Sequence, residues 1–263
     1  LKPLGVSQGL YMADITPKER RATSARPTNL FLLTRCVELF GVLDAAILAE
    51  LYYWIAKGDE PWRKAQEHAD LFCVNEKTIR RHSIDLANKH QCFGRRDSML
   101  KNGKKGACKY FTKKGGNSKA LKEQYQALFN RGFNKTDFGE CMTEEVVEVQ
   151  RFVTLPVAFI ERLKDIEQAY LLARLYWITF SENPSLEFRF SSQNKLAKAM
   201  FMNRTTLMRY LNLLQEKNYL KHSGSTSGIV IHINGEADLY EQMDVWVTEK
   251  QELREELIRE GNH

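Results

Sequence analysis

The side chains best suited to a chemical task are basic and polar residues that recur at helical spacing. In residues 204–216, Leu207, Leu211 and Leu214 fall on one face of a predicted helix and must face a core. Asn203 is a good N-cap for this helix, because its side chain can accept a backbone N–H that would otherwise stay unpaired. The outward face then carries Arg204, Thr205, Thr206, Met208, Arg209 and Asn212.

A shorter predicted helix precedes this one after a tight turn, and its apolar face holds Leu196, Ala197 and Met200. A helix, a turn and a second helix with a basic outer face are what reading of base edges in the major groove requires. The alternative is an ordinary amphipathic helix whose basic face is only solvated. One such stretch does not decide between these two interpretations.

The same layout occurs a second time, in residues 69–89. The matched pairs are Ala69 with Ala197, Asn75 with Asn203, Thr78 with Thr206, Ile79 with Leu207, Arg81 with Arg209, Leu86 with Leu214 and Lys89 with Lys217. The upstream apolar segment repeats as well, 48–55 against 172–178. The repetition predicts two domains of one type. The outward residues of the first copy are Lys77, Thr78, Arg80, Arg81 and His82.

Length and composition suit a globular protein with two cores. The chain has 263 residues, 43% of them hydrophobic, and no apolar run reaches the length of a bilayer span. No signal peptide is visible, although the chain starts at Leu1 rather than Met, which leaves the true N-terminus open. Five cysteines without a Cys-x-x-Cys pair suit free thiols in a reducing cytosol, so we expect a cytoplasmic protein.

The net charge is +6, which favours a polyanionic partner, and its distribution is uneven. A basic segment follows the first helix-turn-helix, and Asn102-Gly103 within it is a strong hairpin signal. A helix-turn-helix followed by a basic hairpin is a winged helix, whose wing lies along phosphates or in the minor groove. The wing residues expected to contact DNA are Arg95, Arg96, Lys101, Lys104, Lys105 and Lys109.

The predicted fold class is mainly α with small β-wings, in two tandem winged helix-turn-helix domains joined by a linker. The boundaries are a basic N-terminal tail over 1–29, a first winged helix over 30–114, a linker over 115–146, a second winged helix over 147–234 and an acidic C-terminal helix over 235–263. The linker's length leaves the relative placement of the two domains open.

No catalytic constellation stands out. The sequence lacks a phosphate-binding Gly-x-x-x-x-Gly-Lys-Ser/Thr loop and a His-x-His pair beside a strand tyrosine. His90, Cys92 and Cys108 could meet across the hairpin, but their spacing matches no common zinc module. We therefore expect no enzymatic activity, no metal and no cofactor.

Three parts of the first copy carry a resemblance to a known family: residues 45–55, Trp62 and residues 74–81. Together they resemble the N-terminal winged-helix segment of phage and plasmid replication-initiation proteins. The tandem layout is similar to that of the two-winged-helix plasmid initiators, which bind repeated sites at an origin. This resemblance implies sequence-specific binding of repeated double-stranded DNA sites and replication initiation for a plasmid, phage or other mobile element.

Two other functions stay open. A transcriptional repressor would bind an inverted repeat at a promoter, whereas an initiator would bind an array of direct repeats. A protein-interaction adaptor would recruit a replication partner and would tolerate loss of the outward arginines. Host replication proteins are further expected partners, a homodimer through a winged helix or the C-terminal helix is a further hypothesis, and no membrane contact is expected.

Overall fold

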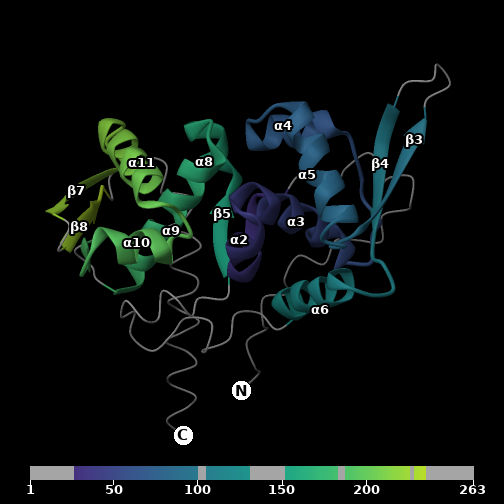
Figure 1. Ribbon diagram of the computed structural model, residues 1–263, viewed down its shortest axis with the longest axis horizontal. Coiled ribbons are helices and arrows are strands. Elements are labelled where there is room, and N and C mark those ends of the chain that lie inside the picture. The colour runs from purple at the N-terminus through teal and green to yellow at the C-terminus, as the bar shows by residue number, and fades with distance from the viewer. Residues whose placement is uncertain (1–26, 100–104, 131–151, 183–186, 226–227, 235–263) are drawn as a thin grey trace, which may run out of the picture.

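The computed structural model describes residues 27–99, 105–130, 152–182, 187–225 and 228–234, in which helices alternate with small antiparallel sheets (Figure 1). Several predicted features lie outside the described residues. These are residues 1–26 of the basic tail predicted over 1–29, the predicted wing residues Lys101 and Lys104, residues 131–146 of the linker and the acidic helix over 235–263. In the described part of the chain, every helix is too short or too polar to cross a lipid bilayer.

The described part of the chain contains two repeats, in which the helices and strands follow one another in the same order. Repeat 1 comprises β1 (Asn29–Leu33), α2 (Thr34–Phe40), α3 (Val42–Ile55), β2 (Trp62–Arg63), α4 (Ala65–Phe72), α5 (Glu76–Asn88), β3 (Gly94–Met99) and β4 (Lys105–Phe111). Repeat 2 comprises β5 (Phe152–Pro156), α8 (Val157–Leu163), α9 (Ile166–Glu182), β6 (Glu187–Phe190), α10 (Gln193–Ala199), α11 (Arg204–Glu216), β7 (Leu220–Ser225) and β8 (Gly228–Ile233). The three-stranded sheets also match, with orders β2-β4-β3 and β6-β8-β7.

Positive φ angles recur at equivalent turns of the two repeats. Gly41 (φ 88°) and Lys164 (φ 58°) separate the first two helices of each repeat. Cys73 (φ 54°) and Phe201 (φ 52°) lie in the turn of each helix pair. A positive φ is unfavourable for residues other than glycine, so its recurrence at matched positions reflects one chain path used twice.

The core contains the side chains that the helical spacing predicts. Leu207, Leu211 and Leu214 of α11 are fully buried, as are Ile79 and Leu86 at the matched positions of α5. The predicted apolar face of α10 is also buried, with Leu196, Ala197 and Met200. Burial of one stripe on each helix leaves the opposite stripe to solvent.

The two repeats share a sheet, so the expectation that their relative placement is open is wrong. β1 and β5 pair antiparallel, with Phe31 opposite Thr154, Asn29 opposite Pro156 and Leu33 opposite Phe152. Phe31 and Thr154 are each the third residue of their strand, so the pairing is symmetric about them. The core helices α3 and α9 also pack on each other. Each of these contacts joins an element of repeat 1 to its equivalent in repeat 2, as a local twofold axis between the repeats produces.

A further helix corrects the predicted linker. α6 (Asn117–Asn130) packs against α3 and belongs to the core of repeat 1. Tyr125 of α6 is buried, and its ring stacks on that of Tyr52 with centroids 5.2 Å apart. The Tyr52 hydroxyl donates to the carbonyl oxygen of Ser118 at 3.0 Å. The polar composition of this segment concealed an apolar face built from a few aromatic and aliphatic side chains.

Candidate nucleic-acid interface

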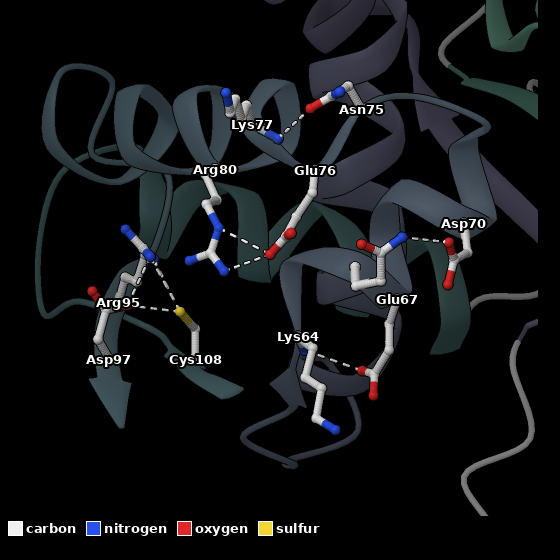
Figure 2. Close-up of polar contacts among 11 residues, drawn as sticks. Lys64, Glu67, Asp70, Asn75, Glu76, Lys77, Arg80, Arg95, Asp97 and Cys108 are labelled. Atoms are coloured by element: carbon white, nitrogen blue, oxygen red, sulfur yellow. Dashed lines mark hydrogen bonds and ion pairs between the residues drawn. The ribbon is translucent and has the colours of Figure 1, made fainter. Parts of the chain in front are cut away.

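Each repeat presents one helix whose start is fixed by an asparagine, as the sequence predicts. The Asn75 side-chain oxygen accepts the backbone N–H of Lys77 at 2.8 Å (Figure 2). The Asn203 oxygen accepts the backbone N–H of Thr206 at 2.8 Å. These caps satisfy donors that a helix start would leave unpaired. The first turns of α5 and α11 are thereby held in matched positions.

The exposed residues at matched positions of α5 and α11 form one stripe on each helix, which we call the outward stripe. Its members on α5 are Lys77, Arg81, Ile84 and Asn88. Its members on α11 are Thr205, Arg209, Asn212 and Glu216. The shared spacing of four, three and four residues keeps all four side chains of a helix on one face. Arg81 and Arg209 occupy equivalent positions at its centre. Asp85 of α5, and Arg204 and Gln215 of α11, are exposed at positions without an exposed counterpart on the other helix.

The outward stripe of α5 includes a residue that the sequence reasoning missed. Ile84 is 40% exposed, and Leu39 and Trp62 are the other large apolar side chains exposed among the described residues. The position of Ile84 seven residues after Lys77 could have revealed it, since that spacing returns to the same helix face. The search for basic and polar residues passed over an apolar one. Within the described residues, neither Lys77 nor Arg81 forms an ion pair.

Two predicted base-reading residues of α5 are engaged elsewhere. The Arg80 guanidinium binds Glu76 one turn earlier, with Nε 3.0 Å from Oε1 (Figure 2). His82 Nδ1 lies 2.6 Å from Asp44 Oδ1, at the start of α3. Burial raises the pKa of Asp44, and the adjacent His82 opposes that shift. We therefore remove Arg80 and His82 from the base-reading candidates, while Thr78 lies half-buried beside the stripe.

On α11 the predicted residues divide in the same way. Arg204 donates from Nε to the Gln193 side-chain oxygen at 2.9 Å and so lies along α10. Thr206 and Met208 are half-buried, and Met208 packs against the core. The Arg209 guanidinium lies 4.9 Å from the ring centroid of Tyr210. Thr205, Arg209 and Asn212 thus remain on the outward stripe.

The predicted wing of repeat 1 is a two-stranded hairpin, but several of its cations are paired. Arg95 binds Asp97 at 2.7 Å and donates to the Cys108 sulfur at 3.3 Å (Figure 2). Its side chain is only 13% exposed. Lys109 forms an ion pair with Glu60. Lys105 belongs to β4, where it pairs with Met99.

Arg96 is the exposed cation of this hairpin whose side chain forms no ion pair within the described residues. In each repeat the hairpin follows the second helix of the pair directly. The two hairpins lie at opposite ends of the molecule's long axis (Figure 1).

The second hairpin is tied to α11 by a histidine. His222 Nε2 of β7 lies 2.9 Å from the Asn212 side-chain oxygen, and its backbone N–H donates to Gln215 at 2.9 Å. Burial lowers the pKa of His222, which favours the neutral ring. Asn212 is thus held in a defined orientation on the outward stripe.

Among the described residues, no three His, Cys, Asp or Glu side chains are grouped to hold a metal ion. No protein-family model, curated protein or solved structure matches this chain.

Proposed function

We propose that the protein binds double-stranded DNA in a sequence-specific way through two winged helix-turn-helix units, one in each repeat. The observation that carries the proposal is the outward stripe, present at matched positions of α5 and α11 with an arginine at its centre. Each helix has 13 residues and is therefore about 20 Å long, a length that fits along the major groove.

The side chains of the stripe suit different bases. Arg81 and Arg209 can each donate two hydrogen bonds to a guanine edge. Asn212 suits adenine, while the exposed apolar surface of Ile84 suits the methyl group of thymine. Lys77 and the exposed Arg96 suit phosphates, which position the protein without reading sequence. The two helices share one residue type and differ in the others, so they recognise related but unequal half-sites.

The pairing of β1 with β5 supports a specific site layout. The pairing is symmetric about Phe31 and Thr154. In our proposal a local twofold axis relates the repeats and sets the two recognition helices in opposite senses along a duplex, as in a symmetric dimer. One chain then recognises an imperfect inverted repeat. The centres of its half-sites are separated by one helical turn of DNA or a multiple of it.

The biological role proposed is origin recognition in the replication of a plasmid, phage or related element, in the cytoplasm or nucleoid of a bacterial cell. An initiator acts on several copies of its site, so that many chains assemble side by side. A repressor needs one site at a promoter. Because a single chain itself recognises an inverted repeat in this proposal, the orientation of the half-sites no longer separates these two roles. The number of sites beside the gene does.

Footprinting of the full chain on the DNA that flanks its gene tests the proposal. The expected result is an array of protected sites, each an imperfect inverted repeat. Arg81→Ala and Arg209→Ala should each weaken protection, whereas Arg80→Ala is a matched control with little effect, because Glu76 already neutralises that arginine. A single protected promoter site would favour the repressor, and an adaptor would leave no footprint.

A further inference from the structure

The sheet of repeat 1 has an outward face with an unusual composition. The strand register places Trp62 of β2, Lys109 of β4 and Arg96 of β3 opposite one another in one row. Side chains in such a row lie on the same face of a sheet. The neighbouring row points to the other face, where Arg63 reaches Glu50 of α3 at 2.7 Å. The row of Trp62 therefore faces away from the helices.

Aromatic and cationic side chains meet on this face. Trp62 is 48% exposed, and Lys109 Nζ lies 6.0 Å from its ring centroid. Phe111 lies two residues beyond Lys109 on β4, hence on the same face. Its ring occupies the space above Gly94, where an added Cβ would lie 2.2 Å from a ring carbon. We call Trp62, Arg96, Lys109 and Phe111 the aromatic–cation face.

The equivalent sheet of repeat 2 has no such composition. Its outward rows are Glu187, His232 and Lys221, and then Arg189, Val230 and Ser223. Phe188 and Phe190 of the same sheet point inward and are buried. An exposed tryptophan is thus not a requirement of this sheet, since the second copy folds without one. Large exposed aromatic side chains beside cations are instead typical of binding surfaces.

We propose that the aromatic–cation face binds single-stranded DNA, with Trp62 stacked on a base and with Arg96 and Lys109 on the adjacent phosphates. Stacking on aromatic rings combined with cations along the backbone is the usual way in which proteins hold single strands. A duplex does not satisfy this face, because its bases are already stacked on one another. The two cations favour a polyanion.

One acidic residue on this surface sharpens the proposal. Glu60 is half-exposed and pairs with Lys109, so it competes with a phosphate for that ammonium. Removal of the Glu60 charge should therefore strengthen binding of a single strand. A merely structural role of this pair predicts no gain. The site lies on the sheet rather than on the outward stripes, and it shares only Arg96 with the contacts proposed for duplex DNA.

The test measures binding of the full chain to a fluorescent oligothymidylate of about 20 nucleotides, which exceeds the span of most single-strand sites. Trp62→Ala should weaken binding about tenfold, and Trp62→Phe should retain most of it, because one stacked base contributes about 1–3 kcal/mol. Arg96→Gln should weaken binding a few-fold. Glu60→Gln should tighten it. Arg189→Gln and Lys221→Gln, on the outward face of the second sheet, are matched controls that should leave it unchanged.

Three results would overturn the inference. The first is that the unmodified chain does not bind the oligonucleotide. The second is that Trp62→Ala binds it as tightly as the unmodified chain. The third is that Glu60→Gln binds it more weakly than the unmodified chain. If Trp62→Ala instead changes the sedimentation of the free protein and leaves oligonucleotide binding intact, the face is a contact between copies of the chain. The duplex footprint of the unmodified chain is measured alongside, so absence of that footprint with oligonucleotide binding retained would contradict only the proposed function.

Discussion

The two repeats carry opposite charges at one equivalent buried position. Glu50 and Arg174 are each the ninth residue of their core helix, α3 or α9, and are 2% and 0% exposed. Glu50 binds Arg63 at 2.7 Å and His68 of α4 at 3.0 Å. Arg174 donates to the Tyr170 hydroxyl, and its guanidinium lies 5.0 Å from the Phe201 ring in the turn after α10.

This difference shows which property the fold requires. In both repeats a buried charged side chain connects the core helix to the helix-turn-helix pair. The sign of its charge differs between the repeats, so the fold does not require one sign. The outward stripes keep one residue and change others. Arg81 matches Arg209, whereas Lys77 is replaced by Thr205 and Ile84 by Asn212. Changes inside preserve the scaffold, and changes outside alter what each repeat can recognise.

The largest expected effect comes from breaking the buried network of repeat 1. Glu50→Gln should lower the free energy of unfolding by about 3–5 kcal/mol, because it leaves Arg63 beside a neutral amide in a buried site. Urea denaturation at neutral pH measures this. Glu76→Gln is the exposed control and should cost about 0.5 kcal/mol or less. An equal loss of unfolding free energy in the two variants would contradict a stabilising role of the buried Glu50–Arg63 ion pair.

The same residue predicts an acid response. Burial by itself raises the pKa of Glu50, but the hydrogen bond and charge of His68, together with Arg63, lower it from its ordinary value of 4.5 to about 2. A carboxyl whose pKa is lowered on folding contributes stability above its unfolded pKa and loses it as pH falls through the folded pKa. The unmodified chain should therefore lose stability between pH 4.5 and about 2 more steeply than Glu50→Gln. Parallel curves of unfolding free energy against pH would contradict this assignment.

Next in size are the two central arginines of the outward stripes. Arg81→Ala and Arg209→Ala should each cost about 1–3 kcal/mol of binding to the cognate duplex and relax specificity in one half-site. Titration at fixed salt gives the affinity, and thermal unfolding should stay unchanged because both side chains are exposed. A loss for every DNA sequence alike would identify phosphate contacts rather than base contacts.

The helix caps should respond equally in the two repeats. Asn75→Ala and Asn203→Ala each remove one side-chain acceptor at a helix start and should lower stability by about 1 kcal/mol. Asn75→Asp and Asn203→Asp keep an acceptor and serve as controls. Urea denaturation measures both pairs. A large effect in only one repeat would show that the two helix starts are not equivalent.

The smallest effect expected is that of the Arg80–Glu76 pair. Both side chains are more than a third exposed, so a double-mutant cycle should give about 0.3–0.5 kcal/mol or less. A larger coupling in the presence of duplex DNA would show that this pair takes part in binding. That result would return Arg80 to the base-reading set.

Much of the scaffold could be predicted from periodicity and turn chemistry. The helix caps at Asn75 and Asn203 and the buried leucines of α11 are encoded locally, since both follow from residues within a few positions of each other. The pairing of β1 with β5 could not be predicted, because strand partners so far apart in sequence leave no local pattern.

The long-range contacts of single side chains were also beyond the sequence. His82 meets Asp44 of α3, and Tyr125 of the supposed linker meets Tyr52. These contacts join segments that only tertiary packing brings together. The Glu76–Arg80 pair is different, because its spacing of four residues on one helix is a local signal from which the pair could have been predicted.

The most direct test of the central claim is selection of duplex sites from random DNA by the full chain, Arg81→Ala and Arg209→Ala. We expect a consensus of two unequal half-sites in inverted orientation, with each substitution relaxing a different half. A consensus with both halves in the same direction, or one that neither substitution changes, would contradict a twofold pair of DNA-reading helices.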